Sequence, residues 1–148
     1  MGKPLNYTYF TWEDIIHMEL QVGIIGSTEV LVSEANTAKT MGSGSLDVFA
    51  TPAMIALMEK AASMAVQNYI EEDSSTVGTM INIKHIAATP VGMNVTARAE
   101  LVGIDGKRLV FTVEAFDGRD KIGEGQHERF IIKAAKFMSK ANSKLNEE

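Results

Sequence analysis

The feature that most constrains the fold is a single long helical segment, residues 52–70, in a chain whose other regular segments before the C-terminal tail mostly alternate like strands. Pro52 is tolerated in the first turn of a helix and Thr51 is a suitable N-cap, so we expect the helix to begin there. At 100° per residue, Lys60 and Gln67 lie away from an apolar face. That face is formed by Ile55, Met58, Ala62, Ala65, Val66 and Tyr69. A helix of this kind needs another layer of structure to cover it.

The segments around this helix have the period of two that is typical of strands. Residues 20–33 are expected to form one long strand before the helix, with Gly23 and Gly26 as candidate bulges. Two Asp-Gly dipeptides, at residues 105–106 and 117–118, are strong hairpin signals among the later segments. The strands expected after the helix are Gly78–Ala88, Met93–Gly103, Arg108–Asp117 and Ile122–Ile132. One strand, one helix and a four-stranded antiparallel meander predict an α+β fold, with a curved sheet around the helix.

The chain is predicted to form one domain with an extension at each end. A chain of 148 residues can bury about two thirds of its unfolded surface in a single core. Residues 20–133 form the predicted domain. Residues 1–20 form an N-terminal arm with four aromatic side chains among seven positions, which we interpret as packing or a subunit contact. Residues 134–148 form a C-terminal helical tail with an apolar face and a lysine face.

Composition excludes several classes of function. The net charge of −5, from 14 Lys and Arg against 19 Asp and Glu, argues against nucleic acid as a partner. The absence of cysteine excludes disulfides, a thiolate nucleophile and a cysteine zinc site. The three histidines lack the spacing of a metal motif, so no metal site is predicted. No apolar run resembles a signal peptide or approaches the roughly 20 residues of a membrane span, so we predict no membrane partner and a cytoplasmic location.

Polar residues on apolar faces are the candidates for chemistry. Glu59 falls within the apolar face of the helix, where a carboxylate is either paired, at the solvent border, or functional. His85 shares the apolar face of its strand with Ile81 and Ile83. A histidine in such a place can be a satisfied core residue, but a histidine beside a buried carboxylate is typical of acid–base sites. Thr51 can cap the helix or direct its hydroxyl at an electrophile near the helix N-terminus.

Around these candidates the sequence resembles a family of hot-dog thioesterases, those related to the fluoroacetyl-CoA thioesterase. The resemblance covers roughly residues 20–138, and several motifs agree in identity and spacing. The motifs are Val48-Phe-Ala-Thr-Pro-Ala-Met54, Glu59, Val77-Gly-Thr79, Lys84-His-Ile-Ala-Ala-Thr-Pro90 and Gly123-Glu-Gly-Gln-His-Glu-Arg129.

The resemblance implies a hot-dog fold and a homodimer, or a higher oligomer, with active sites at the subunit interface. It assigns the catalytic roles to Thr51, Glu59 and His85. It also implies that the Gly78 N–H stabilises the oxyanion and that Arg129 organises the site. We assign Val32 and Phe49, together with Gly78 and Arg129, to substrate binding. Whether Thr51, Glu59 or water is the nucleophile is left open.

The implied activity is hydrolysis of an acyl-CoA to a free acid and CoA, with no cofactor because CoA is part of the substrate. The fluoroacetyl-specific enzyme has phenylalanines before the Val-Phe-Ala-Thr motif, whereas residues 41–47 here contain no aromatic side chain. We therefore expect a short- or medium-chain acyl group instead of fluoroacetyl. The alternatives are a non-catalytic acyl-CoA-binding protein and a hot-dog enoyl-CoA hydratase, because a fold alone does not fix function.

Overall fold

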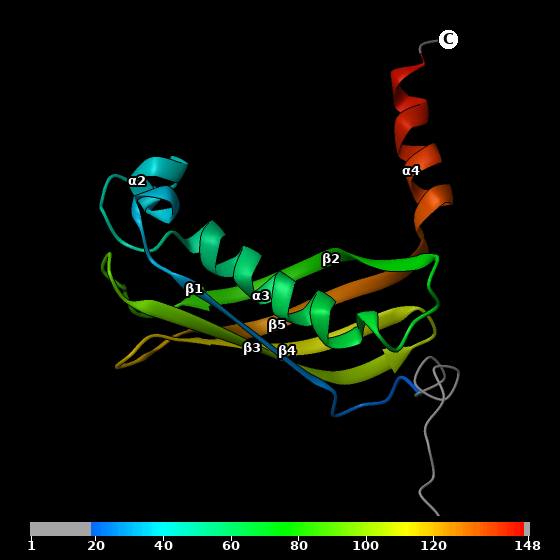
Figure 1. Cartoon of the computed structure of the whole chain (residues 1–148), viewed down its shortest axis with the longest axis horizontal. Coiled ribbons are helices and arrows are strands. Elements are labelled where there is room, and N and C mark those ends of the chain that lie inside the picture. Colours follow the sequence, from blue (N-terminus) through cyan, green and yellow to red (C-terminus); the bar gives the residue numbers. More distant parts are fainter. Residues whose placement is uncertain (1–18, 147–148) are drawn as a thin grey trace, which may run out of the picture.

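The computed structural model describes residues 19–146, in which one antiparallel sheet wraps around one long helix (Figure 1). The predicted N-terminal arm lies, apart from its last residues, outside this described part. The elements in chain order are β1 (Ile25–Leu31), η1 (Glu34–Asn36), α2 (Ala38–Met41), α3 (Thr51–Gln67), β2 (Ser74–His85), β3 (Asn94–Asp105), β4 (Arg108–Phe116), β5 (Lys121–Lys133), α4 (Ala134–Asn142) and η2 (Ser143–Leu145).

The sheet has the strand order β1-β3-β4-β5-β2, and every neighbouring pair is antiparallel. The predicted turn between β3 and β4 is confirmed: Asp105 pairs with Arg108, and Gly106 has a φ of 60°. Between β4 and β5, the Asp117 carboxylate accepts hydrogen bonds from the backbone N–H groups of Arg119 and Asp120, both at 2.8 Å. These two turns join β3, β4 and β5 into a meander.

The predicted four-stranded meander is wrong in one respect, because β2 pairs with β5 and not with β3. The residues between β2 and β3 are too many for a tight hairpin. They are tied instead to the segment before α3, since the Phe49 N–H donates to the Thr89 carbonyl at 2.9 Å and Val48 bridges to Pro90. β2 therefore forms one edge of the sheet and β1 forms the other.

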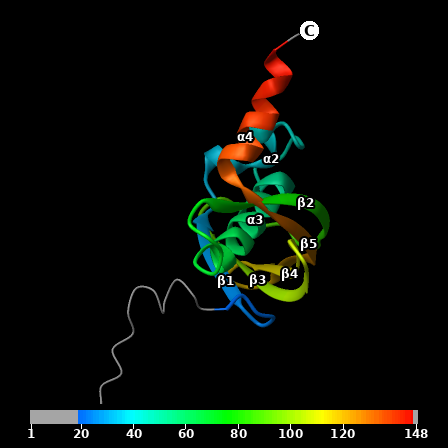
Figure 2. The ribbon, with the colours of Figure 1, turned by 90° about the vertical axis from the view of Figure 1, so that its right-hand side faces the viewer.

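The core lies between α3 and the concave face of the sheet, which curls around the helix (Figure 2). The helix ends at Gln67, three residues before the predicted end, and its exposed residues include the predicted Lys60 and Gln67. Its buried residues are Met54, Leu57, Met58, Ala61, Ala62, Ala65 and Val66, a wider face than predicted. Small alanines on this face allow the helix to lie close to the strands.

β1 begins at Ile25, five residues later than predicted, because Gly23 has a φ of 103° and turns the chain. Gly26 is not the predicted bulge, since it pairs regularly with Ala99. A Cβ at Gly26 would collide with the backbone carbonyl of Ala61 on α3. The glycine is needed for the close approach of strand and helix.

The C-terminal helix α4 projects away from the sheet (Figures 1 and 2). None of its residues is buried, and Phe137 and Met138 are 42% and 52% exposed. Among the described residues, no helix is both long enough and apolar enough to cross a membrane.

Candidate active site

The first polar cluster joins the start of α3 to the end of β2. The Thr51 hydroxyl lies 2.7 Å from Nδ1 of His85. Thr51 is the first residue of α3, and Ala50 occupies the N-cap position without a side-chain hydrogen bond. The predicted capping role of Thr51 is therefore wrong, because its hydroxyl contacts the imidazole. The backbone N–H groups of the first turn carry no side-chain cap and remain able to stabilise an anion.

The surroundings of His85 favour its neutral form. Burial lowers the pKa of His85, and the nearby backbone of Ala87 opposes this effect. Nε2 is buried and has no hydrogen-bond partner within residues 19–146. A neutral imidazole with one nitrogen on a hydroxyl can accept a proton from that hydroxyl, which is the usual arrangement of an activated nucleophile.

A cavity of about 330 Å³ lies beside this pair. Its lining residues are Ala38, Ser43, Val48, Phe49, Thr51, His85, Ile86, Ala87 and Ala88. Most of these side chains are apolar, so the cavity can take an acyl group. Phe49 lines the cavity from the core, whereas Val32 is fully buried within the core.

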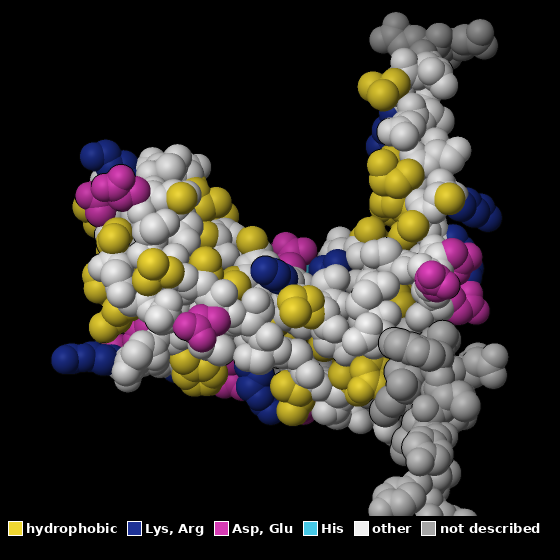
Figure 3. Space-filling view, viewed as in Figure 1, with side chains coloured by type: hydrophobic (Ala, Val, Ile, Leu, Met, Phe, Trp, Pro, Cys, Tyr) yellow, Lys and Arg dark blue, Asp and Glu magenta, His cyan; other side chains and the backbone are white. Residues whose placement is uncertain are grey.

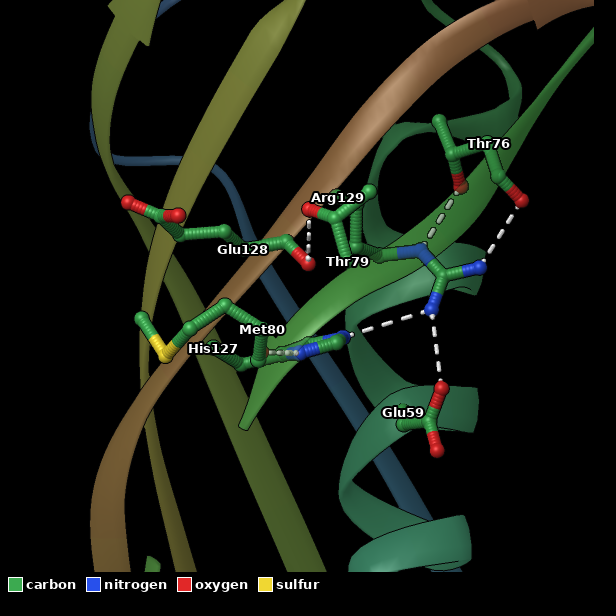
Figure 4. Close-up of polar contacts among 7 residues, drawn as sticks. All are labelled: Glu59, Thr76, Thr79, Met80, His127, Glu128 and Arg129. Atoms are coloured by element: carbon green, nitrogen blue, oxygen red, sulfur yellow. Dashed lines mark hydrogen bonds and ion pairs between the residues drawn. The ribbon is translucent and has the colours of Figure 1, made fainter. Parts of the chain in front are cut away.

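The second polar cluster centres on Arg129 of β5, which is only 7% exposed (Figure 4). Its Nε donates to the Thr76 hydroxyl and its Nη2 donates to the Thr76 carbonyl, both at 2.8 Å. Its Nη1 lies 3.4 Å from Oε2 of Glu59 and 3.2 Å from Nε2 of His127. Burial lowers the pKa of Arg129, and the charge of Glu59 opposes this effect. A buried guanidinium needs such partners, because an unpaired charge is costly in the interior.

Glu59 reaches from α3 to the backbone of β2 at Gly78. A Cβ added to Gly78 would lie 2.6 Å from Oε2 of Glu59, so the absent side chain makes room for the carboxylate. The ladder between β2 and β5 shifts register between Gly78 and Met80. The carboxylate thus lies beside an irregular stretch of backbone, with its side chain 40% exposed.

The two clusters are separate within one chain. Thr51 and Glu59 are eight residues apart on α3, which corresponds to about 12 Å along the helix axis. Glu59 contacts Arg129 and His85 contacts Thr51, and no hydrogen bond joins Glu59 to His85 within the described chain. The structure thus brings together Thr51 with His85, and Glu59 with Gly78 and Arg129.

Sequence reasoning assigned no role to His127 or Thr76, which complete the second cluster. His127 has no exposed surface, and its Nδ1 lies 2.8 Å from the Met80 carbonyl. The strand spacing of His127 and Arg129 places both on one face of β5, but it does not show which residues they contact. In the described part of the chain no group of three or more acidic, histidine or cysteine side chains could hold a metal ion.

Comparison with known proteins agrees with this fold. Residues 32–135 match the model of the family described as fluoroacetyl-CoA-specific thioesterase. The chain is 46% identical over 98 residues to a fluoroacetyl-CoA thioesterase of Streptantibioticus cattleyicolor, covering 66% of this chain and 70% of the relative.

Solved structures show the same similarity. A fluoroacetyl-CoA enzyme with a threonine-to-serine change, in complex with acetyl-CoA, superposes with a TM-score of 0.81 at 37% identity, covering 86% of this chain and 100% of that chain. A thioesterase superfamily member of Thermus thermophilus superposes with a TM-score of 0.78 at 27% identity, covering 84% and 93%. The predicted hot-dog fold and thioesterase class are thereby confirmed, and the chain belongs to the fluoroacetyl-CoA-specific thioesterase family of acyl-CoA thioester hydrolases.

Proposed function

We propose that this protein hydrolyses short- or medium-chain acyl-CoA thioesters at a site shared by two subunits. The observation that carries the proposal is the Glu59 carboxylate, held by Arg129 against the backbone of Gly78. Thr51 and His85 supply the other half of the site from the partner subunit. The substrate needs no resident cofactor, because CoA is itself the leaving group.

The position of β2 supports a shared site. As an edge strand, β2 has one side without a neighbour among the described strands, and Ile81 on it is 38% exposed. Figure 3 shows the surface hollowed between the lobe that carries α2 and the projecting α4, and β2 runs along this hollow (Figure 1). A second copy can therefore approach along β2.

A twofold axis at β2 would join the two polar clusters. Gly78 and His85 lie seven positions apart on this strand. If two β2 strands pair antiparallel about an axis midway between these positions, Gly78 of one subunit lies opposite His85 of the partner subunit. The Thr51–His85 pair would then face Glu59 across the interface.

The reaction converts a thioester and water into a carboxylic acid and a thiol. Glu59 can take the proton of an attacking water, or attack the carbonyl and form a mixed anhydride that water then opens. The Thr51 hydroxyl, with His85 as base, is the third candidate nucleophile. In each route the Gly78 N–H and the first turn of α3 stabilise the carbonyl oxygen, an effect worth about 3–4 kcal/mol per donor. The thiolate of CoA leaves and takes up a proton.

The acyl preference follows from the segment between α2 and α3. From the last residue of α2 onward, residues 41–47 contain no aromatic side chain, and the exposed apolar residues among them are Met41 and Leu46. A fluorine-sensing contact would need a well-shaped apolar wall, and even then one small substituent is worth only about 1–3 kcal/mol. We therefore propose acetyl, propionyl and butyryl groups as substrates turned over at least as well as fluoroacetyl.

The test is release of free CoA from a panel of acyl-CoAs, detected with a thiol-reactive dye, combined with light scattering. Hydrolysis of the short acyl-CoAs by a dimer or larger oligomer is expected. A kcat/KM for fluoroacetyl-CoA orders of magnitude above that for acetyl-CoA would overturn the proposed substrate range. A stable, active monomer of 16.1 kDa would overturn the shared site. Binding without CoA release would favour the non-catalytic alternative.

A further inference from the structure

The contacts of His127 fix its protonation state. Nδ1 faces a carbonyl oxygen, that of Met80 at 2.8 Å, which can only accept a hydrogen bond. Nε2 faces Nη1 of Arg129 at 3.2 Å, which can only donate. The two contacts are satisfied together only when the imidazole carries its single proton on Nδ1. Burial and the neighbouring charge of Arg129 also lower the pKa of His127, which agrees with a neutral ring.

The same contacts hold the guanidinium of Arg129 in one orientation. Two of its three nitrogens are bound to Thr76, through the hydroxyl and the carbonyl. The third nitrogen, Nη1, has two N–H groups, and its two neighbours are His127 and Glu59. When one N–H is fixed on Nε2 of His127, the planar geometry of the group directs the other toward Glu59. Figure 4 shows this chain of contacts from Met80 to Glu59.

We propose that His127 is a positioning residue for thioester hydrolysis, which orients Arg129 and through it the Glu59 carboxylate beside Gly78. This inference rests on the proposed function of Glu59. His127 touches neither Glu59 nor Gly78 through a hydrogen bond in the described structure, so it acts through Arg129. Met80 supplies the acceptor that keeps the ring in the required tautomer.

If His127 had only a structural role, its substitution would affect stability and not turnover. His127 packs against Phe111, with ring centroids 6.1 Å apart, and has no exposed surface. If only this packing mattered, a leucine of similar volume would lower stability and leave the turnover of folded molecules unchanged. If orientation of Arg129 matters, turnover depends on an acceptor at the position of Nε2.

Three variants separate these roles. His127→Gln can present an amide oxygen near the position of Nε2, His127→Asn can present only a donor near the position of Nδ1, and His127→Leu can present neither. We expect kcat on the best acyl-CoA to fall at least about tenfold in the Asn and Leu variants, because each loses a charge-assisted hydrogen bond. KM should change little, and the Gln variant should regain most of the lost kcat. Val95→Ala, which removes core volume on β3 beyond β4, is the control for loss of stability alone.

A second measurement does not depend on activity. Long-range proton–nitrogen NMR spectra of the wild-type protein at neutral pH should show His127 protonated on Nδ1 and unprotonated on Nε2. The Nε2–H tautomer or an imidazolium would overturn the proposal, as would equal kcat in the Gln, Asn and Leu variants. If the Leu variant fails to fold, the comparison of Gln with Asn and the NMR result still decide. If the wild type releases CoA from no acyl-CoA, the proposed function fails, and the tautomer still reports whether His127 orients Arg129.

Discussion

Glu59 is a proposed catalytic base and also a partly buried partner of Arg129, and a substitution can separate these two roles. Glu59→Gln keeps the size of the side chain and can still accept a hydrogen bond from Arg129, but it removes the base. We expect kcat/KM to fall at least about a hundredfold, as is usual for loss of a general base. The melting temperature should change by only a few degrees, because Thr76 and His127 still hold Arg129.

Steady-state kinetics and thermal unfolding of the same preparation provide the measurement for this variant. A Glu59→Gln protein that unfolds readily yet retains normal turnover per folded molecule would make Glu59 a structural partner of Arg129 and nothing more.

The buried histidines predict how stability depends on pH. Burial lowers the pKa of both His85 and His127, and the groups facing His127 are the Met80 carbonyl, Arg129, Glu59 and Glu128. Below the ordinary histidine pKa of about 6.5 the unfolded chain binds more protons than the folded chain. The free energy of unfolding should therefore fall as the pH is lowered from 7 toward 5. Carboxylates add a trend of the same sign. Chemical denaturation of the wild type and of His127→Gln should therefore be compared over this pH range, and the free energy of unfolding of the variant should decline less steeply.

The candidate residues were accessible from the sequence, but their partners were not. Glu59 and His85 stood out as polar residues on apolar faces. The spacing of eight residues already places Glu59 about 12 Å beyond Thr51 along a helix, but it could not show which strand residues lie beside each of them. The partners on β2 could not be predicted because the strand is irregular between Gly78 and Met80. Before this irregularity the side chains that face the helix are at even positions such as Thr76, and after it they are at odd positions such as His85.

At the scale of elements, β2 and the start of α3 were only partly predictable. Both were expected, and the turn chemistry of residues 105–106 placed the β3–β4 hairpin correctly. The N-cap assignment of Thr51 was wrong because the threonine hydroxyl makes a tertiary contact with His85, which a local capping preference cannot predict. The neighbour of β2 could not be read from the sequence, since the connection to β3 is long enough to permit several strand orders.

The free edge of β2 carries a prediction of its own. In the proposed dimer Ile81 lies next to the axis, so Ile81→Lys would bring two like charges near each other. The two lysines would lie close together across the axis, not directly opposite, and we expect the variant to be monomeric by light scattering and to lose activity, although both polar clusters within each chain stay intact. Ile104→Lys is a matched control, because Ile104 is also exposed, at 40%, and lies on β3 away from that edge. A dimeric, active Ile81→Lys protein would place the interface elsewhere.

At the scale of the whole molecule, the sequence predicted the fold class because one amphipathic helix and several strands leave few ways to build a core. The family comparison confirms that class. The order of strands and the separation of the two polar clusters depend on long-range packing, which local patterns do not record. The N-terminal arm stays a prediction, since nearly all of it lies outside residues 19–146.

The separation of the two clusters along α3 has a genetic consequence. If each site takes Glu59 from one subunit and His85 from the other, two inactive variants can restore activity when they form a mixed dimer. A mixed dimer of Glu59→Gln and His85→Ala chains contains one site with both native residues and one with neither. Because random twofold pairing makes half of the dimers mixed, co-expression should restore about a quarter of wild-type activity. Assay of the co-purified pair, with each variant alone as control, would show this complementation, and its absence would mean that both halves of the site belong to one chain.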